Sequence, residues 1–181
     1  MGPLDRPWRL RGAVLALAAV VGVVALIVSG DDDDGSPAAV APEVRIVEAE
    51  ELAGLAASLG HPVYWAGPQP GAELELTQNE DGSVQLRYVE AGAPLGEESP
   101  DVLTIGTYPL PDPRAALRTF AAEPGSVVRR SRKGLEVFSN ETSPSSVYFA
   151  SPDDSVQVEV YDPSPERALG LALSGQVRPA G

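Results

Sequence analysis

The hydrophobic positions divide this chain into one uninterrupted apolar run near its start and an alternating, amphipathic remainder. From Gly12 to Gly30 there are 19 residues without a charge, mostly Ala, Val and Leu. As a helix, this run is about 28 Å long at ~1.5 Å per residue, close to the ~30 Å hydrocarbon core of a bilayer. Arg6, Arg9 and Arg11 precede the run, and four aspartates, Asp31–Asp34, follow it. The pattern therefore predicts one transmembrane helix.

The flanking charges also predict the orientation of this helix. Arginines on the short N-terminal side favour a cytoplasmic N-terminus. We expect residues 1–11 to be a cytoplasmic stub too short to fold, 12–30 a transmembrane signal anchor, 31–43 an acidic Ala/Pro linker and 44–181 an extracytoplasmic domain. The alternative is a signal peptide cleaved before Asp31, because small residues precede that position. The apolar run is, however, longer than the ~7–15 residues usual for the hydrophobic region of a signal peptide.

The outer domain begins with helical periodicity and continues with alternation. Apolar residues at i, i+3, i+4 and i+7 predict a helix over Glu48–Leu59. Two more helices are predicted to begin at Asp112-Pro113 and Ser164-Pro165, where a capping residue precedes proline. Eight strands are predicted, and the pair around the Asn79–Gly82 turn is expected to have one wet face. They cover 63–66, 74–76, 84–88, 102–108, 126–130, 135–139, 146–150 and 155–161.

The order of these segments indicates the fold class. Short turns between consecutive strands favour antiparallel pairing. We therefore expect an α+β domain with an antiparallel sheet of about eight strands and helices packed on one face. The segments ending at Leu117 and Leu169 resemble each other once one residue is removed. Two interpretations follow. The domain consists of two similar halves, each of four strands and a helix, or the two strand-to-helix junctions are unrelated and merely use the same capping residues.

Charge and composition exclude several functions. Residues 31–181 hold 10 basic and 25 acidic residues, a net charge of −15, which disfavours binding to nucleic acid. The chain has no cysteine, so disulfides, thiol nucleophiles and lipid-modified cysteine anchors are excluded. The tetra-aspartate does not fit a calcium loop, since an EF-hand alignment places Gly30 and Ala41 at ligand positions. No metal site or cofactor is predicted.

Candidate catalytic groups are sparse. His61 is the sole histidine, and no serine lies in a G-x-S-x-G turn. The acidic pairs, such as Glu97-Glu98, fall in predicted loops, where solvated carboxylates are expected. We therefore predict no catalytic residues and a domain that is not an enzyme. An extracytoplasmic hydrolase is the least favoured alternative.

Two groups of residues are candidate contacts. Tyr64 and Trp65 are adjacent in a predicted strand, so their side chains are expected on opposite faces, one of them exposed. With the nearby His61, they form the predicted ligand or partner contact. Arg129, Arg130, Arg132 and Lys133 form the basic cluster of the domain, at a predicted hairpin tip. This cluster is a candidate contact for anionic lipid headgroups or wall polymers.

Short segments of the domain resemble membrane-anchored proteins of actinobacteria. The resemblance rests on His61–Pro68, Ser146–Tyr148 and Val158–Pro163, and would cover most of residues 44–181. It implies export but no activity and no site residues. The chain is thus expected to be a single-pass protein of the cell membrane, inserted in the bilayer through residues 12–30. Its outer domain would bind another envelope protein or a wall polymer. A cleaved, secreted domain that binds wall polymer or a small ligand is the alternative.

Overall fold

The computed structural model describes residues 42–97, 99–150 and 156–181. The predicted anchor, 12–30, and most of the predicted linker lie outside these residues. None of the helices within the described ranges is both long and apolar enough to cross a membrane.

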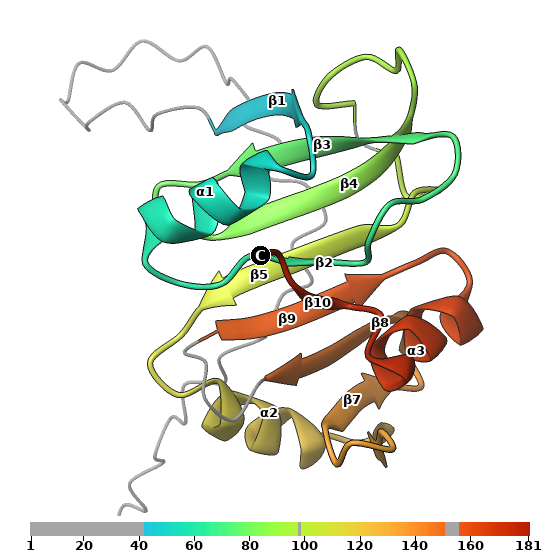
Figure 1. Cartoon of the computed structure of the whole chain (residues 1–181). Helices are drawn as coiled ribbons and strands as arrows, with labels where there is room; N and C mark the ends of the chain where they lie inside the picture. Colours follow the sequence, from blue (N-terminus) through green and yellow to red (C-terminus); the bar gives the residue numbers. More distant parts are fainter. Residues whose placement is uncertain (1–41, 98, 151–155) are drawn as a thin grey trace, which may run out of the picture. The chain divides into compact units, whose positions relative to one another are not determined.

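The domain is built on one eight-stranded antiparallel sheet, so the predicted α+β class is confirmed (Figure 1). The strand order is β1-β3-β4-β5-β9-β8-β7-β6, and every neighbouring pair is antiparallel. The strands are β1 (Glu43–Val47), β3 (Ala72–Gln78), β4 (Val84–Glu90), β5 (Thr104–Pro109), β6 (Ser126–Arg130), β7 (Glu136–Asn140), β8 (Ser143–Ala150) and β9 (Val156–Tyr161).

Three helices join or follow these strands. They are α1 (Glu51–Leu59), α2 (Pro113–Ala121) and α3 (Pro165–Ser174). The two predicted caps are confirmed: the Asp112 side chain accepts from the Ala115 amide at 2.8 Å, and Ser164 Oγ accepts from the Arg167 amide at 3.4 Å. Helix α1 begins three residues later than predicted. Glu51 there turns back to accept a bond from the Glu48 amide, so the residues before it form a turn.

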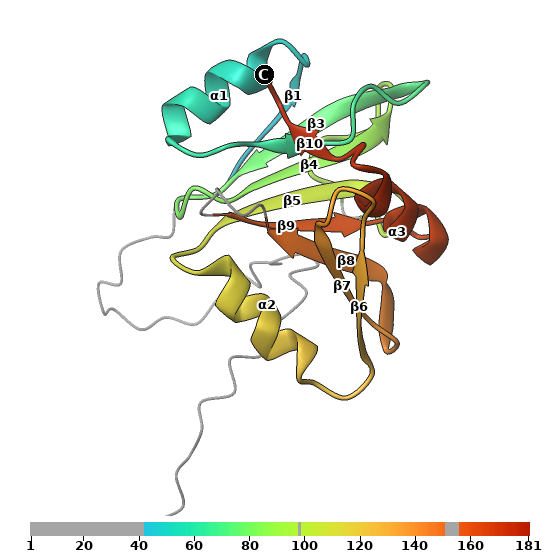
Figure 2. The same ribbon diagram turned by 60° about the horizontal axis from the view of Figure 1, so that its bottom comes forward.

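The expectation that the helices share one face of the sheet is wrong. Leu52 of α1 and Ala168 of α3 belong to the main core, whereas Leu117 and Phe120 of α2 pack with Phe138 and other residues in a separate cluster. Adjacent Val137 and Phe138 of β7 fall in different clusters, so the clusters lie on opposite faces. Figure 2 shows α1 and α2 on the two sides of the sheet. We call the side of α1 and α3 the helical face and the other the α2 face.

One predicted strand lies outside the sheet, and one sheet strand was not predicted. Residues 63–66 contribute only β2 (Tyr64–Trp65), which pairs with β10 (Arg178–Pro179) in a separate two-stranded ladder. Figure 1 shows this ladder crossing in front of the sheet. The eighth position is filled by β1, which pairs with β3. The sheet therefore has the predicted number of strands, but one of them, β1, replaces a predicted strand.

The hairpin of β3 and β4 does not have the wet face that its alternation predicts. Glu75 is only 1% exposed, and its carboxylate accepts from Arg87 Nη1 at 2.7 Å and from the Gly96 amide at 2.8 Å. The described parts of the β4–β5 connection, residues 91–97 and 99–103, therefore fold back over the α2 face. At their far end, the Tyr161 hydroxyl donates to the Pro100 carbonyl at 2.7 Å.

Candidate functional site

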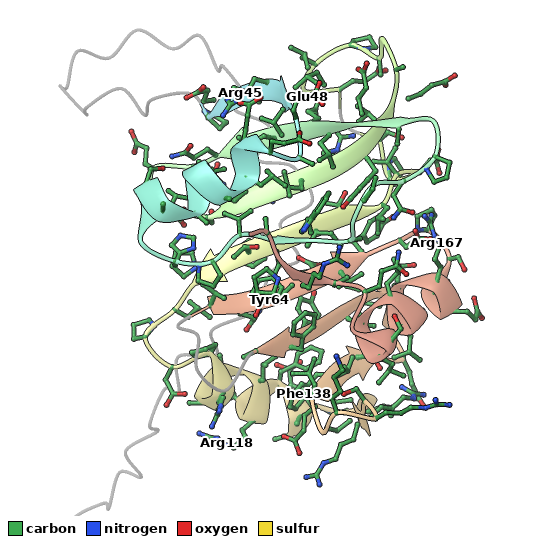
Figure 3. All side chains as sticks on the ribbon, in the orientation of Figure 1. Arg45, Glu48, Tyr64, Arg118, Phe138 and Arg167 are labelled. Carbon is green, nitrogen blue, oxygen red and sulfur yellow. The ribbon has the colours of Figure 1, made fainter. Side chains whose placement is uncertain are left out.

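The short β2–β10 ladder separates two adjacent aromatic residues. Tyr64 is 4% exposed and packs edge-on against Phe149, with ring centroids 5.7 Å apart. Its amide donates to Thr107 Oγ1 at 3.1 Å, and Figure 3 shows Tyr64 over the middle of the sheet. Trp65 points the other way and is half-buried. Tyr64 is therefore a core residue, and Trp65 is the member of the pair that reaches the surface.

Trp65 lies between a cation and a small groove. The guanidinium carbon of Arg178 is 5.8 Å from the centroid of the Trp65 ring, within cation–π range. The groove has a volume of about 170 Å³ and also involves residues 46–49, 68–69 and 72–74. We call it the Trp65 groove. Because small-molecule sites usually measure ~300–1,000 Å³, this one suits a single ring or side chain.

Tyr88 forms part of the groove wall and holds the Trp65 loop in place. Its hydroxyl accepts a bond from the Ala66 amide at 2.7 Å. Burial raises the pKa of Tyr88 to about 12, although the Ala66 bond and the positive charge of Arg178 oppose the rise. The phenol therefore stays protonated at neutral pH. Among the described residues, none accepts its proton.

His61 is not part of the Trp65 groove. Its Nδ1 lies 3.0 Å from the Pro62 carbonyl oxygen, and its Nε2 lies 3.0 Å from the Gly82 carbonyl oxygen. A neutral imidazole donates to one such acceptor, and an imidazolium donates to both. The ring thus braces the turn after α1 against the β3–β4 turn. Among the residues that the structure describes, the hydrogen-bond partners of His61 are these two backbone carbonyls, so the geometry gives no nucleophile-and-base pair there.

The predicted basic cluster is divided by the alternation of β6. Arg129 points to the helical face, where Nη1 donates to Ser139 Oγ at 3.2 Å. Arg130, on the α2 face, pairs with Glu136 at 2.7 Å. Arg132 and Lys133 are exposed at the hairpin tip, where the Gly134 amide donates to the Ser131 carbonyl. The four charges share one end of the sheet but do not form one flat surface.

A second groove runs beside β6 on the helical face. Its volume is about 310 Å³, and we call it the β6 groove. Val127 and Arg129 of β6 form one wall, with Val147 and Pro144 of β8 below and Leu169 of α3 opposite. Glu141 and Glu166 also line it, so its charge is mixed.

A polar network on the α2 face was not predicted from the sequence. The hydroxyls of Tyr108 and Tyr148 donate to the two carboxylate oxygens of Glu159, each at 3.1 Å. Burial, followed by the charge of Glu159, raises the pKa of both phenols. The three residues come from three neighbouring strands, β5, β9 and β8, whose pairing alternation alone does not specify.

Comparison of the chain with protein-family models, with curated proteins and with solved structures finds no match. What the grooves bind is therefore inferred from their own geometry. No group of three or more His, Asp and Glu suited to a metal ion occurs among the residues that the structure describes.

Proposed function

We propose that this chain is a membrane-tethered, extracytoplasmic binding domain, that it is not an enzyme, and that its main ligand contact is the Trp65 groove. The observation that carries the proposal is the position of Trp65. It is a large aromatic side chain that is only half-buried and lines a groove, while its neighbour Tyr64 is buried. Tryptophan in such a setting is the residue type most often responsible for binding energy at interfaces.

The groove suits one kind of ligand group. Val47, Leu74 and Pro68 provide apolar walls beside the Trp65 ring. Tyr88 forms part of the wall, and the exposed Glu48 is at the rim. An aromatic ring with polar groups beside it binds a partly apolar ring or side chain that also hydrogen-bonds. We infer that such a group is presented by a wall polymer or by another envelope protein.

The proposed tether rests on the sequence of residues 12–30 and on the charges around it. The proposed location outside the cytoplasm rests on the arginines that precede residues 12–30 and the aspartates that follow them. The mass of the mature protein tests this part. We expect a full-length chain that needs detergent for extraction. A soluble product that begins at Asp31 would instead support the secreted alternative.

The binding proposal is tested by sedimentation of the full-length chain in detergent with purified insoluble cell wall and, separately, by capture on solubilised envelope proteins. Trp65→Ala is expected to weaken one of these interactions at least tenfold, since central interface residues contribute ~2 kcal/mol or more. Tyr161→Ala is the matched control, because Tyr161 is a half-buried aromatic residue on the α2 face. Equal binding by wild type and Trp65→Ala, or no binding in either arm, would contradict the proposal.

A further inference from the structure

The charge of the domain is concentrated at one end of the sheet. Residues 113–136 contain six basic and two acidic residues, a net of +4, in a region, 31–181, with a net of −15. These residues form α2, β6 and the β6–β7 turn. Among them, only Arg130 has an ion pair with a carboxylate of the described residues. Arg118 extends outward from α2 in Figure 3. The cationic end therefore differs in sign from the rest of the surface.

This end is also where the sheet stops. Strand β6 pairs with β7 on one side and with no described strand on the other. Two backbone bonds at the ends of the β6–β7 ladder show which β6 residues bond to β7. One runs from the Glu141 amide to the Gly125 carbonyl, and the other from the Ser131 amide to the Leu135 carbonyl. Because hydrogen-bonded pairs alternate in an antiparallel ladder, residues 127 and 129 bond to β7. The main-chain groups of Val128 and Arg130 therefore point away from the sheet.

The unpaired edge has apolar and charged surface on its two sides. Val128 is 45% exposed on the α2 face, beside Arg130. On the helical face, Val127 and Arg129 stand at the edge and separate it from the β6 groove, which lies over β7 and β8. Edge strands are normally protected by charge, proline or a covering segment, and an open one is a template for another strand. Charge is the only one of these protections that the described part of β6 has.

We propose that β6 is the docking edge for an extended, acidic segment of a partner protein, which adds to the sheet as a ninth strand. The site is separate from the Trp65 groove and does not depend on the function proposed for it. The added strand would bond to the main chain of Val128 and Arg130, in the strand-addition mode of peptide recognition. Its side chains alternate, so one set lies beside Val127 and Arg129 on the helical face and the other beside Val128 and Arg130 on the α2 face.

This geometry specifies the segment. On the helical face, Val127 and the aliphatic stem of Arg129 suit apolar side chains, and on the α2 face Arg130 suits acidic side chains. An alternating acidic and β-branched sequence meets both requirements, and glutamate with valine is the simplest example. An anionic lipid surface would satisfy the charges alone. It would leave the outward main-chain groups without partners, so the peptide is favoured.

The test uses the full-length chain in detergent micelles and a fluorescent peptide of alternating Glu and Val, with binding followed by anisotropy. A second peptide is N-methylated at alternate residues. The methyl groups remove the backbone N–H donors along one edge of the peptide strand and leave every charge in place. Saturable binding of the first peptide, weakened at least tenfold by N-methylation, is expected. Equal binding of both peptides would overturn strand addition, and so would binding to vesicles containing anionic lipid without binding to the peptide.

Two protein variants locate the site. Val128→Pro removes an outward amide that β7 does not use, at an edge position that tolerates proline. It is expected to weaken the peptide about tenfold. Arg130→Gln is expected to weaken the peptide severalfold and reduce its salt dependence. Arg45→Gln is the matched control on the opposite edge strand, since Arg45 pairs with Glu51 at 2.9 Å much as Arg130 pairs with Glu136 at 2.7 Å.

The remaining outcomes also decide the proposal. Thermal melts show whether Val128→Pro is folded, and if it is not, the N-methylated peptide still tests the main-chain bonds. Binding that is unchanged in a folded Val128→Pro and in Arg130→Gln would overturn the assignment to β6. Concentration-dependent self-association that competes with the peptide and is lost in Val128→Pro would make a second copy the occupant and overturn the proposed partner.

Discussion

A methyl group added at Gly106 tests how Tyr108 is held on the α2 face. A Cβ built at Gly106 would lie 2.5 Å from the Tyr108 hydroxyl oxygen and 2.6 Å from Cε2. Gly106 is not among the glycines with positive φ, so alanine meets no backbone strain there. The cost of Gly106→Ala therefore comes from the contact with the Tyr108 ring, which lies flat over Gly106 to reach Glu159.

The magnitude follows from what the ring must give up. To avoid the methyl group, Tyr108 must rotate away and lose its 3.1 Å bond to Glu159. Bonds to charged groups contribute about 1.5–3 kcal/mol. Replacing glycine by alanine returns about 0.4–1 kcal/mol by restricting the unfolded chain. We expect Gly106→Ala to lower the free energy of unfolding by about 1–2 kcal/mol. In the Tyr108→Ala background, the same change should be neutral or stabilising by about 0.5 kcal/mol.

The assay is urea unfolding of the full-length chain in detergent, with Trp8→Phe so that Trp65 is the single tryptophan. The four chains form a double-mutant cycle, and the expected coupling between the two positions is about 2 kcal/mol. Equal costs of Gly106→Ala in the Tyr108 and Tyr108→Ala backgrounds would refute the reasoning. Such a result would show that the ring moves without losing a bond that matters for stability.

Three further changes test the energetics of the fold by the same unfolding assay. Arg87→Ala should lower the free energy of unfolding by about 3–5 kcal/mol, because it leaves the buried Glu75 carboxylate without its cation. Arg45→Ala, at an exposed pair, should lower it by under ~1 kcal/mol. Similar losses for the two variants would contradict this reasoning. Raising the pH from 10 to 12 should destabilise the domain, because unfolded tyrosine ionises near ~10 while the pKa of buried Tyr88 is about 12. The folded state then holds more protons than the unfolded state, and Tyr88→Phe should reduce the slope by up to ~1.4 kcal/mol per pH unit. Asp112→Ala, which removes the α2 cap, should cost about 1 kcal/mol, and no loss would show that the cap bond is replaced by water.

Local signals in the sequence were sufficient for much of the fold. The caps at Asp112 and Ser164 and the β6–β7 hairpin are consequences of neighbouring residues, and all were predicted. The face on which each helix packs was not. The linker before α2 is one residue longer than the linker before α3, with four residues after Tyr108 and three after Tyr161. This one-residue difference is the visible sign that the two junctions are not equivalent, and the two helices lie on opposite faces.

The candidate site was predicted in part. The opposite orientations of Tyr64 and Trp65 follow from strand alternation and agree with their burial. The position of His61 depends on the β3–β4 turn, 21 residues away, which no local pattern specifies. The Tyr108, Tyr148 and Glu159 network likewise depends on pairing between distant strands. Glu75 was expected to be exposed because charge normally indicates solvent, but the loop over it depends on contacts with Gly96 and Tyr161.

The topology at the centre of this account is open to direct measurement, because Lys133 is the only lysine of the chain and is exposed. A membrane-impermeant amine reagent applied to intact cells can therefore react with only Lys133 and the α-amino group. We predict label at Lys133 of a full-length, membrane-bound chain, and label at the N-terminus only after permeabilisation. Two results would contradict the tethered arrangement. One is labelling of Lys133 only after permeabilisation, and the other is labelling, in intact cells, of a chain whose N-terminus is Asp31.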